Sequence, residues 1–220
     1  VFLTTVAAQN IKIIRNINEH QQQVLHDVSY QMIELKSLVP TLVYDIRYAN
    51  DSNFTGKQLY QKGNKTFLRK PAAIALQQVQ RSLEKEGLGL KIWDAYRPYT
   101  ATVTMWQLIQ DERYVANPAK GSGHNRGLAV DVTLIDLKTG KELDMGTGYD
   151  HFSDTAHISF MQLSPQVLQN RKLLQKEMEA AGFTILPTEW WHFYWPNNKE
   201  YAVLDLTFEQ LANQKKRKGK

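Results

Sequence analysis

The sequence predicts a single domain of the α+β class, and two observations lead to this prediction. The chain has 220 residues, of which 42% are hydrophobic, which is enough to build one domain around a sizeable core. Its predicted strands and helices are mixed, without the strict alternation of strand and helix that builds a parallel sheet. No internal repeat and no low-complexity linker divides the chain further.

The first predicted elements are a polar lead-in and a strand. Residues 11–35 (IKIIRNINEHQQQVLHDVSYQMIEL) are polar and favour helix without clear ends. Residues 41–51 alternate well enough for a strand, and the pattern breaks at Asn50 and Asp51. We therefore expect a strand over 41–51.

Residues 70–87 (KPAAIALQQVQRSLEKEG) predict a helix with marked ends. Pro71 suits the first helical position, and Gly87 suits the position after the last turn. The expected buried side consists of Ile74, Leu76, Val79 and Leu83.

The middle of the chain predicts a strand, a helix and a second strand. Residues 88–96 form a short strand before the turn at Arg97 and Pro98, and residues 100–112 form a helix. Residues 127–136 (GLAVDVTLID) are the clearest strand. Side chains alternate between the two faces of a strand. The two faces here are Leu128, Val130, Val132 and Leu134 on one side and Ala129, Asp131 and Thr133 on the other.

The last predicted elements are a helix and an aromatic segment. Residues 163–183 predict a helix capped by Ser164, with Pro165 at its first position and Gly182 at its end. Residues 189–195 (EWWHFYW) place one carboxylate and one imidazole inside a run of five aromatic side chains. This segment is either a core strand whose histidine is satisfied or a part of a metal site.

Composition excludes several kinds of site. The chain has no cysteine, which rules out disulfides, cysteine-ligated zinc, iron–sulfur clusters and a thiolate nucleophile. Lysine and arginine exceed the acidic residues by 27 − 22 = 5, and the tail KKRKGK (215–220) carries five positive charges. The neutral remainder argues against a nucleic-acid groove. We expect the tail to be a solvated end, with weak attraction to an anionic surface as the alternative.

Both ends of the chain are expected to lie outside the main domain. Residues 1–9 (VFLTTVAAQ) are apolar and end in small residues, as a signal peptide does before its cleavage site, which predicts a periplasmic or exported bacterial protein. The alternative is the start of an ordinary amphipathic helix in a cytoplasmic protein. No run of about 18 apolar residues exists to span a membrane. We divide the chain into a lead-in (1–30), a main domain (31–212) and a basic tail (213–220).

Two of the six histidines are candidate metal ligands. His124 lies in a glycine-bracketed loop before the clearest strand, and Asp131 follows it by 131 − 124 = 7 positions on the strand's minority face. His192 adds a second imidazole, and Glu189, three positions earlier, is close enough to act as a general base. Two imidazoles and one carboxylate form a three-ligand zinc set with a fourth position open to water. Of the remaining histidines, His20 and His26 are expected to be solvated. His151 is expected at the rim of the pocket or on the surface, and His157 is expected to be structural or exposed.

Two motifs, SGHNRGLAVDVTL (122–134) and EWWH (189–192), resemble those of the zinc DD-peptidases, and in particular the VanX-type zinc D-alanyl-D-alanine dipeptidases. Further segments resemble the family in the expected order: NFTGK (53–57), WDAYRP (93–98) and DLKTGKELDMG (136–146). The resemblance covers roughly residues 38–210. It implies a central, mostly antiparallel sheet flanked by helices, as in the zinc DD-peptidase/Hedgehog-type fold.

The resemblance also implies a role for each matching residue. The ligands of one zinc ion per chain match His124, Asp131 and His192. Glu189 matches the catalytic base, and Arg97 matches the arginine that polarises the scissile carbonyl and stabilises its oxyanion, with Asp94 placed to orient it. The substrate-binding positions match Ser122, Asp150, Tyr48 and, across a gap in the alignment, Tyr60.

The implied function is zinc-dependent hydrolysis of the dipeptide D-Ala-D-Ala, in which Glu189 takes a proton from the metal-bound water and delivers it to the leaving amine. One alternative is a cell-wall DD-carboxypeptidase or endopeptidase that acts on peptidoglycan stem peptides in a more open cleft. A second alternative is an inactive, zinc-stabilised binding module. Glu189 and Arg97 argue against the second, because a purely structural zinc needs neither. The sequence indicates no oligomeric state.

Overall fold

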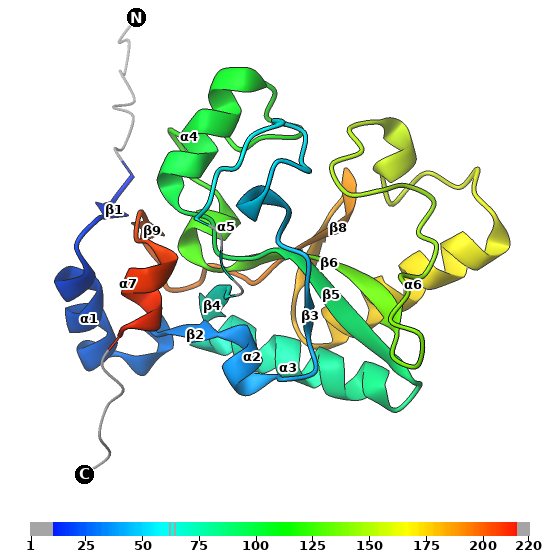
Figure 1. The fold of residues 1–220 in the computed structure, drawn as a ribbon, viewed down its shortest axis with the longest axis horizontal. Coiled ribbons are helices and arrows are strands. Elements are labelled where there is room, and N and C mark those ends of the chain that lie inside the picture. Colours follow the sequence, from blue (N-terminus) through cyan, green and yellow to red (C-terminus); the bar gives the residue numbers. More distant parts are fainter. Residues whose placement is uncertain (1–10, 62, 64, 215–220) are drawn as a thin grey trace, which may run out of the picture.

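The computed structural model describes residues 11–61, 63 and 65–214, and its centre is a five-stranded sheet (Figure 1). The strand order is β3-β5-β6-β8-β7. β3 and β5 are parallel, and all the other neighbours are antiparallel. The strands are β3 (Val43–Tyr44), β5 (Leu88–Asp94), β6 (Ala129–Asp136), β7 (Thr184–Leu186) and β8 (Glu189–Tyr194). The predicted α+β class with a mostly antiparallel sheet is confirmed.

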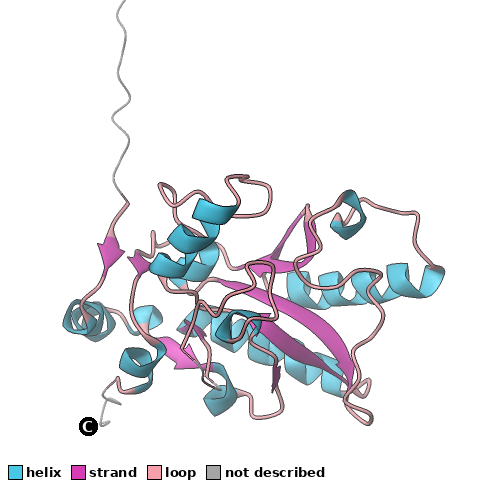
Figure 2. Cartoon of the chain, turned by 45° about the horizontal axis from the view of Figure 1, so that its top comes forward, coloured by secondary structure: helices cyan, strands magenta, loops and turns pink. Residues whose placement is uncertain are grey.

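The long helices α3 (Lys70–Glu84) and α6 (Pro165–Ala180) cover the sheet, and they contact each other as well as β5, β6 and β8 (Figures 1 and 2). Ser164 caps α6 as predicted, through a hydrogen bond from Val167 N. The helix expected over 100–112 is α4 (Tyr99–Leu108), which ends four residues earlier. The predicted helices therefore exist, with small shifts at their ends.

The predicted buried side of α3 is wrong at one position. Ile74 is 40% exposed, whereas Leu76, Val79 and Leu83 are buried as expected. The other buried residues of α3 are Ala72, Ala73, Ala75 and Gln80. At about 100° per residue, Ile74 lies on the side of the helix opposite to Leu76, Val79 and Leu83, so the buried side that these three residues define excludes it.

The strand predicted over 41–51 is also wrong in its length. Only Val43 and Tyr44 pair with β5, and the chain then forms a short 3-10 turn at Arg47–Ala49. Asp45 N donates to Ile92 O as the chain leaves the sheet edge. This departure carries Tyr48, which is 2% exposed, away from the strand direction.

The lead-in forms part of a second, smaller core beside the sheet. β1 (Ile13–Ile14) pairs in parallel with β9 (Val203–Leu204), and β2 (Met32–Glu34) pairs with β4 (Phe67–Arg69). The core residues are Ile14, Met32, Phe67, Tyr96, Leu204, Leu206 and Leu211. The other short elements are α1 (Ile17–His26), a 3-10 turn (Val28–Tyr30), α2 (Leu35–Leu38), α5 (Gly123–Arg126), a 3-10 turn (Asp154–Ala156) and α7 (Phe208–Ala212).

His20 corrects a further expectation, because it is fully buried rather than solvated. It lies on α1, and its side chain points inward, whereas His26 at the end of the same helix is exposed as expected. The predicted signal-peptide remnant (1–9) and the charges of the basic tail (215–220) fall outside the described residues.

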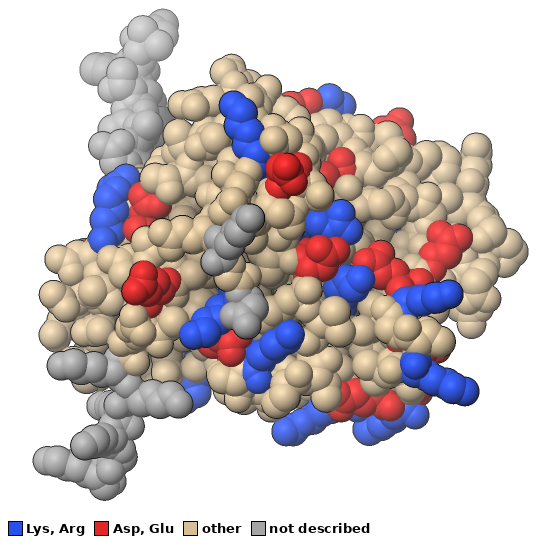
Figure 3. Space-filling view, in the orientation of Figure 1, with Lys and Arg blue, Asp and Glu red and all other residues tan. Residues whose placement is uncertain are grey.

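The surface of the molecule carries charges of both signs. Basic and acidic side chains are interspersed over the face of the molecule seen in Figure 3, rather than gathered into fields of one sign. None of the helices within the described ranges is both long and apolar enough to cross a membrane.

Candidate active site

His124 is held in a single helical turn rather than in the loop that we predicted. Ser122 caps this turn, α5: its hydroxyl accepts from Asn125 N, and the Asn125 side chain accepts from Ser122 N. Gly127 ends the turn with φ of 69°, a conformation that glycine adopts without strain. The chain then reverses directly into β6, which brings His124 back beside Asp131.

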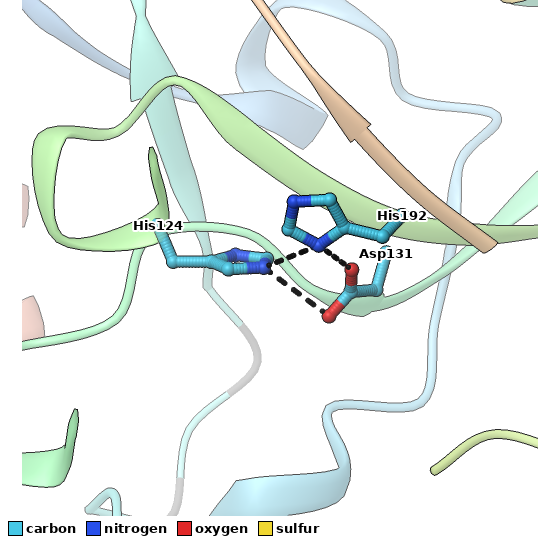
Figure 4. A group of neighbouring side chains, drawn as sticks. All are labelled: His124, Asp131 and His192. Carbon is cyan, nitrogen blue, oxygen red and sulfur yellow. Dashed lines mark hydrogen bonds and ion pairs between the residues drawn. The ribbon is translucent and has the colours of Figure 1, made fainter. Parts of the chain in front are cut away.

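Three side chains meet at one point (Figure 4). His124 Nε2 lies 3.2 Å from His192 Nδ1 and 3.3 Å from Asp131 Oδ2, and His192 Nδ1 lies 2.9 Å from Asp131 Oδ1. Asp131 and His192 are direct partners across β6 and β8, so both side chains leave the same face of the sheet. The sequence-predicted ligand set is therefore brought together by one strand pairing and one helical turn.

The spacing of these atoms suits a metal ion without rearrangement. Tetrahedral ligands about 2.0–2.1 Å from zinc lie about 3.3 Å apart. The three observed separations of 2.9–3.3 Å match that value. Within the described residues this is the group of histidine and acidic side chains close enough to hold a metal ion.

The surroundings of the three candidate ligands determine which of their atoms carry protons. His124 Nδ1 lies 2.7 Å from the carbonyl oxygen of Ala95, which fixes the proton on Nδ1 and leaves the Nε2 lone pair to face the site. Burial lowers the pKa of His192 and so favours the neutral, ligating imidazole. Burial alone would raise the pKa of Asp131, but the two neighbouring histidines, His124 first, hold it below its usual range. Asp131 is therefore an anion.

Glu189 lies beside this group without belonging to it. Its carboxylate is 3.9 Å from His192 Nδ1, and its side chain is only 9% exposed. Burial, and then the negative charges of Asp131 and Asp150, raise the pKa of Glu189 well above its usual value. A carboxyl group of this kind is suited to hold and release a proton.

Arg97 approaches the site from the connection between β5 and α4, and Asp94 holds it in position. Its Nε and Nη2 lie 3.0 and 2.9 Å from Asp94 Oδ2, and its guanidinium carbon lies 5.1 Å above the centre of the Tyr48 ring. Burial alone would lower the pKa of Arg97, but the Asp94 carboxylate raises it well above its usual value. The predicted orienting contact is thus present, and Arg97 is a fixed cation.

Tyr60 and Asp94 lie behind Arg97 rather than in the wall of the pocket. The Tyr60 hydroxyl donates to Asp94 at 3.0 and 3.1 Å, and both residues are buried. Tyr60, which was predicted to bind substrate, therefore lies with Asp94 where the two support Arg97. Neither side chain lines the pocket that contains the three candidate ligands.

A pocket of about 210 Å³ opens in front of the three ligands. Ser122, Asp150 and Tyr48, all expected to contact substrate, line it together with Arg97 and Glu189. The Tyr48 hydroxyl donates to both oxygens of Asp150 at 3.0 Å. Burial, and then the charge of Asp131, raise the pKa of Asp150 to about 8.

Several lining residues carry no signal in the sequence. Tyr149 donates a hydrogen bond of 2.8 Å to Asp131 Oδ2, although 18 positions separate the two residues. Phe54 and Tyr114 line the pocket mouth, and Phe152 packs on both of them. These contacts depend on how three long loops fold together, and no periodic pattern marks them. His151, by contrast, is exposed as expected, and His157 is half-buried outside the pocket.

Comparisons with known proteins converge on one family. A family described as D-ala-D-ala dipeptidase matches residues 28–213, a stretch that contains every residue of the site. The D-alanyl-D-alanine dipeptidase of Escherichia coli K12 is 37% identical over 174 residues, which cover 79% of this chain and 89% of that protein. The D-alanyl-D-alanine dipeptidase of Enterococcus faecalis is 33% identical over 170 residues, covering 68% of this chain and 84% of that protein. The solved structure of the LdcB LD-carboxypeptidase aligns with a TM-score of 0.40 at 23% identity, over 71% of this chain and 75% of that one.

Proposed function

The chain belongs to the D-Ala-D-Ala dipeptidase family of peptidases, and on that premise we propose that it hydrolyses the free dipeptide D-Ala-D-Ala to two D-alanines with one bound zinc ion. The observation that carries the proposal is the joining of two features in one pocket. His124, Asp131 and His192 have the spacing of zinc ligands, and Glu189 and Arg97 line the same pocket without belonging to that set. A structural zinc has no use for either of the two.

A zinc ion bound here would supply a Lewis acid that polarises the peptide carbonyl and favours deprotonation of water. The chain supplies the rest. Glu189 takes the proton from the attacking water and passes it to the nitrogen of the leaving D-alanine. Arg97, held by Asp94, presents its N–H groups to the carbonyl oxygen as negative charge develops there.

The amino end of the substrate is assigned to Asp150. A free dipeptide carries an ammonium group one residue from the scissile bond, and Asp150 with Tyr48 forms the polar part of the pocket wall suited to that charge. The ammonium lowers the raised pKa of Asp150 again, because an adjacent positive charge favours the carboxylate form. A longer stem peptide carries a neutral amide at the same place. The small pocket volume and this carboxylate favour the dipeptidase over the carboxypeptidase alternative.

The decisive experiment combines metal analysis with product analysis. We expect the purified protein to hold about one zinc per chain and to release D-alanine from D-Ala-D-Ala. L-Ala-L-Ala and a muropeptide ending in D-Ala-D-Ala are the comparison substrates. Faster cleavage of the muropeptide would establish the carboxypeptidase instead, and a zinc-loaded protein that cleaves none of the three would establish the binding module.

The ligand assignment has its own control. His192→Ala removes one of the three ligands and should lose most of the zinc to a chelator, because two protein ligands hold the ion weakly. Full zinc occupancy in His192→Ala would contradict the proposed ligand set.

A further inference from the structure

Asp131 holds two neighbouring histidines and one tyrosine around its carboxylate. Its Oδ1 faces His192, and its Oδ2 faces both His124 and Tyr149. The carboxylate is 2% exposed, so solvent contributes little to its orientation. Its partners within the protein therefore decide which way it points.

Metal binding changes this set of partners. A histidine nitrogen that ligates a metal ion directs its lone pair at the ion and carries no proton. His124 Nε2 and His192 Nδ1 can then donate no hydrogen bond to Asp131. Among the side-chain contacts of the described residues, the Tyr149 hydroxyl is the one donor to this carboxylate that remains.

Tyr149 is itself held in place by aromatic neighbours. Its ring centre lies 5.0 Å from Trp93, 5.7 Å from Trp191 and 6.0 Å from Tyr48. The edge-on contacts to Trp191 and Tyr48 and the tilted contact to Trp93 leave the ring little freedom to turn. The hydroxyl position is therefore set by packing before any metal arrives.

The backbone next to Tyr149 explains how two adjacent side chains face one pocket. Asp150 has φ of 56°, in the left-handed region that aspartate tolerates better than most residues. In an extended chain, neighbouring side chains point to opposite sides. Here the turn at Asp150 allows Tyr149 to reach Asp131 while Asp150 receives the hydrogen bond from Tyr48.

We propose that Tyr149 is a positioning residue for the metal centre: its hydroxyl holds Oδ2 of Asp131, so that the carboxylate is presented to the ion in a single orientation. The inference rests on the proposed zinc site and adds a residue to it. Outer-shell hydrogen bonds of this kind typically change metal affinity or activity by about 10- to 100-fold.

The test is the rate at which zinc passes from the protein to an excess of a coloured chelator. Tyr149→Phe keeps the ring and its packing but removes the donor, and we expect zinc release to be roughly 10- to 100-fold faster than in the wild type. Tyr48→Phe is the matched control. It removes a hydroxyl from the neighbouring ring whose acceptor is Asp150, and zinc release should stay at the wild-type rate.

A second readout separates positioning from loss of structure. The metal-free forms of wild type and Tyr149→Phe should melt within a few degrees of each other, because without the ion Asp131 keeps its contact with His192. With cobalt(II) in place of zinc, the visible absorption of Tyr149→Phe should shift, since the carboxylate changes its mode of binding, while Tyr48→Phe should match the wild type.

The outcomes distinguish the two proposals. Equal zinc release from wild type and Tyr149→Phe, or equally accelerated release from both tyrosine variants, would overturn the role of Tyr149 and leave the zinc peptidase intact. A wild-type protein that binds no zinc would overturn the proposed function and this inference with it.

Discussion

Glu189 is buried and has two carboxylates nearby, and both features make its carboxyl group hold a proton more tightly. Burial, Asp131 and Asp150 together raise its pKa, while the Arg97 guanidinium opposes them. A divalent cation beside Glu189 lowers its pKa again, because the opposite charge favours the ionised form. The proton affinity of Glu189 would therefore depend on whether the neighbouring site holds an ion, and metal loading would prepare the proposed base.

Glu189→Gln should abolish most turnover without loss of zinc. Glutamine keeps the size of the side chain but cannot take up a proton, and a general base typically contributes about 10²- to 10⁴-fold to the rate. We expect kcat to fall by that range, with zinc content measured in the same preparation and equal to wild type. Near wild-type kcat in this variant would rule out the proposed base.

Asp150→Asn should change substrate preference rather than the chemical step. Asparagine tolerates the left-handed backbone at this position and can still accept from Tyr48, so the pocket shape is kept. A charge-assisted hydrogen bond to the substrate ammonium contributes about 1.5–3 kcal/mol, which corresponds to a loss of roughly 10- to 100-fold in kcat/KM for D-Ala-D-Ala.

The comparison substrate for Asp150→Asn is N-acetyl-D-Ala-D-Ala, which carries no ammonium. Its kcat/KM should stay constant or rise in the variant, so the preference for the free amine shrinks. An equal loss with both substrates would show that Asp150 acts on the structure of the site and not on the amino group.

Among the elements, the loops at the pocket mouth are joined by an aromatic clasp made of Phe54, Tyr114 and Phe152. The ring centre of Phe152 lies 5.1 Å from Phe54 and 4.7 Å from Tyr114. These residues come from the loop after β3, the loop after α4 and the loop after β6. Phe152 does not line the pocket but holds together two rings that do.

Phe152→Ala should loosen the clasp and widen the mouth. We expect KM for D-Ala-D-Ala to rise a few-fold, kcat to change little, and cleavage of a pentapeptide stem to improve relative to the dipeptide. Phe160→Ala is a control, because Phe160 comes from the same loop and is not among the residues that line the pocket. Unchanged relative cleavage of the pentapeptide in Phe152→Ala would show that the clasp does not restrict substrate length.

The elements also show what sequence patterns can and cannot predict. The helices with proline at the start and the strand Ala129–Asp136 were predictable, because their signals are local and repeat along the element. Ile74 was assigned to the wrong side of α3 because its hydrophobicity was counted without its angular position, which is opposite to Leu76, Val79 and Leu83. The strand at 41–51 was overestimated because the chain turns away from β5 after Tyr44, into the 3-10 turn at Arg47–Ala49, although the alternation in the sequence continues.

Some residues of the candidate site could be predicted from the sequence, and others could not. His124, Asp131, His192 and Glu189 could be predicted because two short motifs carry all four, and a single strand pairing then joins the motifs. Tyr149 could not be predicted, since its contact with Asp131 depends on the path of the loop after β6. Tyr60 was assigned to substrate, whereas its hydroxyl binds Asp94.

At the scale of the whole molecule, His20 links the stability of the second core to pH. It is fully buried, and neither ring nitrogen has a hydrogen-bond partner among the described residues. Burial, and then the charge of Arg69, lower its pKa from 6.5 to about 4. Between these values the unfolded chain binds the proton more readily than the folded one, so the free energy of unfolding falls as the pH falls.

Replacing His20 with leucine should remove part of this pH dependence. In the wild type, His20 should lower the free energy of unfolding by roughly 2 kcal/mol between pH 7.5 and pH 5, from the shift in its pKa. Urea unfolding of wild type and His20→Leu at both pH values measures the difference. His26→Leu, at an exposed site on the same helix, is the control. An identical pH dependence in wild type and His20→Leu would contradict the prediction.

The pairing of β1 with β9 has a consequence for the order of events during synthesis. Ile13 pairs with Val203, so 203 − 13 = 190 positions separate the two partners. A ribosome delivers the amino end first, and β1 must therefore wait for almost the entire remainder of the chain before it finds its neighbour. Closing so long a loop costs little more free energy than closing one of half the length, but it is slow. We expect the pairing of β1 with β9 to be among the last steps of folding, after the central sheet has formed.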